Sequence, residues 1–185
     1  MPKDDKDQTP PPGAPPPRTV GTRALTPAER ALAESAFAGK DLGYDGVRLS
    51  NGAGANPAAM MAFANGNPAI TLSRTIYFVE GRFRDDFSTG DLRDRLLLLH
   101  ELTHIWQYRT LGFARFMARY AVELARCGLN ARKLYLYPEG ARFDDSMLEA
   151  QAEMVAHYAK ALLTGNAPER QKLAKSLAGT GFYGL

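Results

Sequence analysis

The sequence has little cysteine and no long apolar run. Cys127 is the single cysteine among 185 residues, which excludes a disulfide within the chain and a zinc site built from cysteines. No stretch approaches the roughly 18 apolar residues that span a bilayer. The charged start MPKDDKDQ is not followed by the apolar region of a signal peptide. We therefore expect no membrane insertion, and a cytoplasmic location unless a secretion machine exports the chain without a signal peptide.

The sequence also lacks a large excess of charge of either sign. Lys and Arg number 23 against 20 Asp and Glu, for a net charge of +3, and no basic block stands out from the acidic residues around it. The charge argues neither for nor against nucleic acid, and in the absence of a basic block we expect no nucleic-acid partner. The hydrophobic content of 45% and the length favour one globular domain.

Proline is concentrated at one end. Seven of the twelve prolines fall within the first 17 residues. Residues 1–22 are therefore predicted to be a disordered, Pro-rich tail that cannot form a core. We expect a metallopeptidase-like domain over residues 23–166, for the reasons given below, and a short C-terminal helix and tail over 167–185.

The ordered part of the sequence predicts an α+β fold. A first helix should begin after Thr26, which has Pro27 next to it and Glu29 three residues later, as in a capping box. The following region is rich in β-branched and aromatic residues, and we expect a small antiparallel sheet there, with strands at 47–50, 60–64, 69–73 and 75–79.

From residue 91 onward the pattern predicts helices. Ser88 and Asp91 have capping-box spacing, and the run from 91 to Gly112 is apolar on most sides, as expected of a buried central helix. A second helix follows, with arginines along a face that we take to be solvated. Residues 129–145 are expected to connect it to a third helix capped by Ser146, and a last short helix should span about 168–177. The sheet is predicted to pack on this bundle.

Two of the three histidines stand in the motif His100-Glu101-Leu102-Thr103-His104. Residues four apart share one face of a helix, so both imidazoles can reach a single zinc ion. Glu101 is rotated by about 100° from His100, which places it beside the metal, where it can act as a general base. The alternative is a pair of core histidines with local hydrogen bonds. We favour the metal, since burying these groups among leucines costs several kcal/mol unless they have partners.

A third metal ligand is expected on the downstream helix, where Glu149 and Glu153 stand four residues apart. We assign Glu149 to zinc and Glu153 to the free N–H of a ligand imidazole, and the reverse assignment stays open. His157 is the remaining histidine. We favour the interpretation that His157 is a surface or core residue. The alternative is that it is a metal ligand or a donor to the oxyanion.

These motifs resemble a known class. HELTHIWQ followed by EAQAE resembles the gluzincin pattern, in which a later helix supplies a ligand acid and an orienting acid, matched here by Glu149 and Glu153. The segments TIYFVEGRFRDDF, HELTHIWQY and FDDSMLEAQAEMVAHY resemble small bacterial VgrG-related proteins. These carry a metallopeptidase-like domain akin to the one attached to extracellular contractile injection systems. The spacing from His104 to Glu149 is long for gluzincins, because the arginine-bearing helix is inserted there.

The resemblance implies a zincin-like fold and a zinc-dependent peptidase. Zinc-activated water, deprotonated by Glu101, would attack a peptide bond of a peptide or protein substrate. Tyr135, Tyr137 and His157 are candidate oxyanion donors from position alone. The strand at 75–79 is a candidate edge for pairing with an extended substrate, and a purely structural strand is equally expected.

Two further interpretations stay open. The chain can be a non-catalytic zinc-binding adaptor of a secretion apparatus, although Glu101 speaks against it, since a structural zinc site needs no base. It can also be a toxin-like effector, associated with a type VI or contractile injection system through a VgrG-like partner. The sequence does not separate an effector from a processing enzyme.

Overall fold

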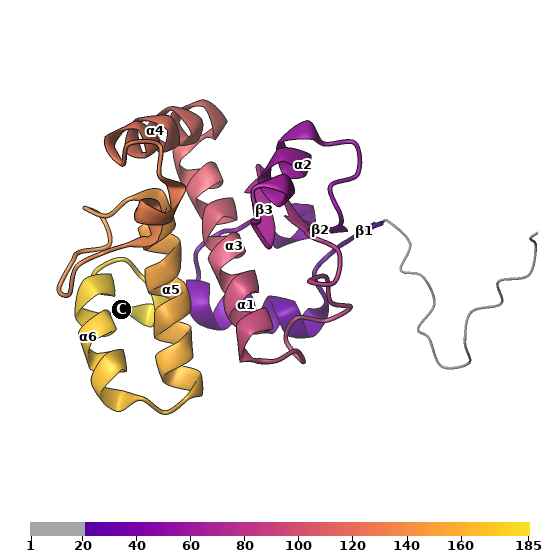
Figure 1. The fold of residues 1–185 in the computed structure, drawn as a ribbon. Coiled ribbons are helices and arrows are strands. Elements are labelled where there is room, and N and C mark those ends of the chain that lie inside the picture. The colour runs from indigo at the N-terminus through magenta and orange to yellow at the C-terminus, as the bar shows by residue number, and fades with distance from the viewer. Residues whose placement is uncertain (1–20) are drawn as a thin grey trace, which may run out of the picture.

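The computed structural model describes residues 21–185 as an α+β fold in which a small sheet packs beside a group of helices (Figure 1). The strands are β1 (Thr22–Arg23), β2 (Arg48–Asn51), β3 (Ala69–Leu72) and β4 (Thr75–Phe78). The α-helices are α1 (Pro27–Phe37), α2 (Pro57–Ala64), α3 (Leu92–Leu111), α4 (Phe113–Arg126), α5 (Leu148–Leu163) and α6 (Ala167–Leu177). Short 3-10 turns are η1 (Tyr44–Gly46), η2 (Ala131–Tyr135) and η3 (Phe182–Gly184). The predicted fold class is confirmed.

The sheet is mixed rather than purely antiparallel. Its strand order is β1-β2-β4-β3, and β2 and β4 run parallel, while the other two pairs are antiparallel. The reason lies in α2, which the sequence pattern had predicted as a strand at 60–64. Pro57 occupies the first turn, and the Asn56 side chain accepts the N–H groups of Ala58 and Ala59, so this segment starts as a helix.

The order of the strands also decides which edge is open. β4 lies between β2 and β3, so residues 75–79 form an inner strand; of the two interpretations of this segment, the edge strand is wrong. Among residues 21–185, β3 pairs with β4 alone and is the outer strand on that side. It is also the strand that contacts α3 most extensively. An exposed strand edge therefore lies directly beside the helix that carries His100 and His104.

The first helix begins as its sequence predicts. Thr26 accepts the Glu29 N–H and the Glu29 carboxylate accepts the Thr26 N–H, which completes a capping box. Glu29 is fully buried, and it also binds the Arg23 guanidinium and the Phe87 N–H. One carboxylate thus joins β1, α1 and the loop that precedes α3.

α3 runs through the middle of the molecule, between the sheet and α5 (Figure 1). Leu98, Leu102 and Ile105 are fully buried, as the apolar pattern predicts. The helix starts at Asp91, whose side chain accepts the Asp94 N–H. Ser88 does not cap it, since its hydroxyl donates to Asp86 instead.

The start of α5 is fixed by α4 rather than by the predicted cap. The Ser146 hydroxyl donates to the Arg142 carbonyl, whereas the Leu148 N–H donates to the carboxylate of Glu123 on α4 (2.9 Å). Arg119 pairs with Glu123 and donates to the Ser146 carbonyl, so this arginine is partly buried and not simply solvated. Arg115 is exposed, as expected. α4 is therefore attached to the first turn of α5.

The C-terminal segment packs into the same core. α6 lies against α5, and Phe182 is fully buried against Phe37 and Trp106. The Tyr183 hydroxyl donates to the Val155 carbonyl of α5. At the other end, β1 begins at Thr22, inside the tail predicted for 1–22, and residues 1–20 of that tail lie outside the described part. None of the helices in residues 21–185 combines the length and apolarity that a membrane span requires.

Candidate metal centre

His100 and His104 lie one turn apart on α3 and present their Nε2 atoms to one another at 3.2 Å. Both imidazoles are buried, with 7% and 6% of their residue surface exposed. Their ring planes are nearly perpendicular, at 80°. This is the arrangement that the i, i+4 spacing on a helix predicts.

Glu149 comes from the first turn of α5 and completes the cluster. Its Oε2 atom lies 3.2 Å from His100 Nε2 and 3.1 Å from His104 Nε2. The three side chains form a buried group that can hold a metal ion. The structure therefore brings Glu149, and not Glu153, to the Nε2 side of the two rings.

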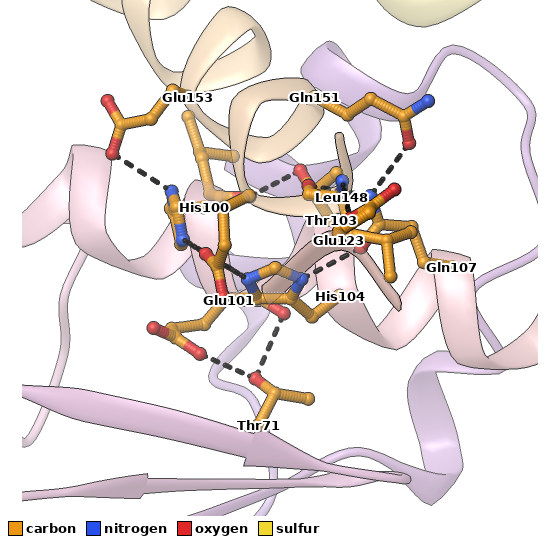
Figure 2. Close-up of polar contacts among 12 residues, drawn as sticks. Thr71, His100, Glu101, Thr103, His104, Gln107, Glu123, Leu148, Gln151 and Glu153 are labelled. Carbon is orange, nitrogen blue, oxygen red and sulfur yellow. Dashed lines mark hydrogen bonds and ion pairs between the residues drawn. The ribbon is translucent and has the colours of Figure 1, made fainter. Parts of the chain in front are cut away.

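The outer nitrogen of each imidazole has its own acceptor (Figure 2). His100 Nδ1 lies 3.3 Å from Glu153 Oε1, and His104 Nδ1 lies 2.8 Å from Gln107 Oε1. A proton held at each Nδ1 leaves the Nε2 lone pairs free and directed toward Glu149. In metal sites such partners set the tautomer and orientation of the ligand imidazoles.

Gln107 also connects α3 to α5. Its amide nitrogen donates to the Leu148 carbonyl (3.0 Å) and to Gln151 Oε1 (2.9 Å), which places the first turn of α5 against His104. Sequence reasoning missed this residue. The available signal was its position three residues after His104, on the same face of the helix.

Tyr137 and His157 lie on the outer side of His100. The Tyr137 hydroxyl is 2.6 Å from His157 Nδ1, and His157 Nε2 is 3.1 Å from Glu153 Oε2. Their polar atoms thus form a chain that ends at the acid behind His100, away from the three facing ligand atoms. Tyr137 is not among the residues that line the groove described below. This placement gives no support to either residue as an oxyanion donor.

Glu101 lies beside the cluster and not in it. Its carboxylate accepts a hydrogen bond of 2.7 Å from the Thr71 hydroxyl of β3 (Figure 2). Glu101 is 5% exposed and lines the cavity in front of the histidines. The Thr71 contact was not visible in the sequence, because β3 and α3 are thirty residues apart at this point.

The electrostatics of the cluster favour bound positive charge. Burial lowers the pKa of the His100 imidazole, but hydrogen bonds to Glu149 and Glu153 outweigh burial and raise that pKa above its ordinary value. Burial raises the pKa of Glu149, and the two histidines outweigh burial and lower it. The carboxylates of Glu101, Glu149 and Glu153 surround two imidazoles, so a cation is the natural partner for the group.

A groove opens in front of the three ligand atoms. On one side it is bounded by β3, and on the other by α4 and η2. Tyr135 of η2 stacks on the His100 ring, with centroids 5.9 Å apart and planes 16° apart. Burial raises the pKa of Tyr135, and the charges of Glu149 and Glu101 add to it, so the phenol keeps its proton. Tyr135 is thus the predicted donor that lines the groove in front of the three ligand atoms, whereas His157 lines its continuation toward α5.

The fold and the cluster together define the class of the chain: an α+β protein whose histidine pair is arranged as on the HExxH helix of a zincin. Comparison with known proteins is more specific. Residues 24–112 match the family described as the eCIS core domain, and both histidines lie inside the matched segment, whereas Glu149 lies beyond it.

A solved structure extends this similarity past the domain match. The chain is similar to the effector domain of VgrG2b from Pseudomonas aeruginosa, with 26% identity and a TM-score of 0.62. The match covers 88% of this chain and 86% of the other. No curated protein sequence matches the chain. The resemblance that the sequence motifs indicated is confirmed.

Proposed function

We propose that the chain is a zinc-dependent peptidase that acts as an effector or processing enzyme of a contractile injection system. The observation that carries the chemistry is the cluster of three facing ligand atoms with a free carboxylate beside it. Around a tetrahedral zinc ion, ligands at about 2.0–2.1 Å lie about 3.3 Å from one another. The spacings of 3.1–3.2 Å among His100, His104 and Glu149 fit such an ion.

The three ligands proposed are His100, His104 and Glu149, with Glu153 and Gln107 holding the imidazoles. Catalytic zinc sites use three protein ligands and keep one position open, and here the groove lies over the open side. When bound, zinc supplies a Lewis acid that polarises a carbonyl oxygen and lowers the pKa of a water molecule.

Glu101 is proposed as the general base. Its carboxylate lies beside the ligand atoms, lines the groove and is fixed by Thr71. From there it takes the proton of the attacking water and delivers it to the leaving nitrogen of the peptide. Tyr135 has its hydroxyl protonated and its ring against His100, so it is the proposed donor to the developing oxyanion.

The substrate is proposed to lie along β3. This strand pairs on one side only and lines the groove with Ala69, Ile70 and Leu72, so its backbone can pair with an extended peptide. The sequence suggested residues 75–79 as the strand that pairs with an extended substrate, and we propose β3 for this role instead. Main-chain pairing holds a substrate carbonyl near the cluster, whatever its side chains.

The association with an injection machine rests on the comparisons. The eCIS core domain match and the likeness to an effector domain both indicate a chain that works with such an apparatus. A VgrG-like partner and export without a signal peptide follow from this proposal. A zinc-binding adaptor without catalysis would require neither Glu101 nor the groove in front of it.

Glu101→Gln separates these functions. We expect the variant to bind as much zinc as the unaltered protein, measured by elemental analysis, and to lose cleavage of an unbiased peptide mixture by a factor of about 100 or more. Glu34→Gln, on the exposed face of α1, is the matched control and should change neither. Unchanged cleavage in Glu101→Gln contradicts the mechanism. Growth inhibition on expression that disappears with Glu101→Gln would favour an effector.

A further inference from the structure

The groove over the candidate site has two halves of different character. Five residues line both halves: Asn67, Ala69, His100, Glu101 and Tyr135. One half continues along β3 to Leu72 and under α4. The other passes Pro68 and continues toward Glu153 on α5. A segment extended along β3 therefore crosses the ligand atoms and enters both halves.

The half under α4 is aromatic. Phe116 and Tyr120 of α4 line it together with Tyr108 of α3, and Met117 stands at its mouth, 40% exposed. The rings of Phe116 and Tyr108 stack with centroids 3.8 Å apart, and Phe116 packs edge-on against His104. This half of the groove, including the space in front of His100, Glu101 and Glu149, measures about 150 Å³, comparable in volume to a cavity that holds a benzene ring. A bulky apolar side chain therefore fits beside the ligand atoms.

The half toward α5 is basic. Three cationic side chains line it and have no ion-pair partner among residues 21–185: Arg82, Arg93 and Lys160. Its three carboxylates are already engaged, and one of them is Glu101, which accepts the Thr71 hydroxyl. Asp94 pairs with Arg84 at 2.7 Å, and Glu153 lies between His100 and His157. This half, about 420 Å³ in volume, therefore offers a positive surface to a bound chain.

Resting on the peptidase function proposed above, we propose that the substrate is a protein segment with a bulky apolar residue on one side of the cleaved bond and acidic residues on the other. The apolar side chain enters the cavity lined by Tyr108, Phe116 and Tyr120. The acidic residues lie over Arg93 and Lys160. α4 supplies Phe116, Met117 and Tyr120 to the apolar half, so the insertion between His104 and Glu149 contributes to the choice of substrate.

Internally quenched peptides of equal length test this preference. Each carries Phe or Gly on one side of a central bond, and a Glu pair or a Lys pair on the other, and each pattern is made in both orders. In the zinc-loaded protein we expect kcat/KM to be about 10-fold or more higher for Phe than for Gly in one order. Glu should exceed Lys by roughly 3-fold, and 0.5 M NaCl should reduce this difference.

Binding provides a readout without turnover. Fluorescence anisotropy of the same peptides with Glu101→Gln should give the same ranking of affinities. Tyr120→Ala should remove the advantage of Phe, and Arg93→Glu should reverse the preference between Glu and Lys. Arg115→Glu changes the same charge on the exposed face of α4, outside the groove, and should leave both preferences in place.

The outcomes separate this proposal from the peptidase function. Cleavage that Glu101→Gln abolishes but that does not distinguish the peptides in either order contradicts the substrate class and leaves the peptidase in place. If no peptide in the set or in an unbiased mixture is cleaved, the peptidase function fails. In that case the peptide affinities measured by anisotropy test the proposed specificity of the groove. Equal affinities for all peptides contradict it.

Discussion

At the scale of single residues, the site depends on hydrogen bonds that lie behind the ligand and base atoms. Glu153 and Gln107 each face the outer nitrogen of one imidazole, and Thr71 donates to Glu101. Each of these contacts limits the rotation of a candidate ligand or of the proposed base. The geometry of the candidate site therefore rests on residues outside the three candidate ligands and the proposed base.

Thr71→Val should lower kcat by about 10-fold with little change in KM, because the valine keeps the shape but leaves the Glu101 carboxylate free to rotate. Steady-state kinetics on a peptide substrate measures this, and elemental analysis should find zinc unchanged. Thr71→Ser keeps the hydroxyl and should restore most of the rate. Thr103→Val removes a buried hydroxyl that donates to the Leu99 carbonyl, and should leave kcat within about 2-fold. A Thr71→Val enzyme at full rate would show that Thr71 does not position the base.

Glu149→Ala and Glu153→Ala should differ in metal content. Removing Glu149 takes away one of three ligand atoms, so the purified protein should contain little zinc. Removing Glu153 frees the Nδ1 side of His100, and zinc affinity should fall by about 10–100-fold while the metal is retained at saturating zinc. Competition with a chelating dye measures both affinities. The opposite result would exchange the roles of the two acids.

At the scale of elements, the cluster depends on how α5 is held against α3 and α4. The Leu148 N–H at the start of α5 is bound by Glu123 of α4, and the Leu148 carbonyl by Gln107 of α3. Glu149 is the next residue, so these two bonds fix the position of its backbone. In the same way, β3 fixes the position of the Glu101 carboxylate through Thr71. The unpaired edge of β3 lies along the groove.

Glu123→Ala should destabilise the fold by about 1–2 kcal/mol, because it leaves the Leu148 N–H without its cap. The same change should weaken zinc binding, since it loosens the turn that carries Glu149. Urea unfolding and a zinc titration measure the two effects. Glu34→Ala removes an exposed carboxylate paired with Arg30 and should cost less than about 1 kcal/mol. If the two variants lose the same free energy of unfolding, Glu123 does not act as a cap of α5.

At the scale of the whole molecule, both ends of the described chain are tied to the core. β1 is held through Glu29 to α1, and the C-terminal turn η3 inserts Phe182 between Phe37 and Trp106. Trp106 lies on α3, two residues beyond His104. The last residues of the chain therefore support the helix that carries the candidate ligands, from the side opposite the sheet.

Phe182→Ala should destabilise the protein by about 3–5 kcal/mol, as expected when a fully buried aromatic side chain is removed. Chemical denaturation followed by Trp106 fluorescence measures this loss. Leu162→Ala is the control, since Leu162 is 41% exposed and its loss should cost little. A small effect of Phe182→Ala would show that the C-terminal turn does not contribute to the core.

Local sequence determined the parts of this protein that depend on neighbours a few residues apart. The His100–His104 pair on one helix face, the Thr26 capping box and the helix end at Gly112 all follow from such spacing. The tertiary structure alone decided the rest. It placed β3 at the edge, and joined Thr71 to Glu101 and Glu123 to α5. These contacts join residues 25 or more positions apart, or depend on competition among strands, so no local pattern carries them.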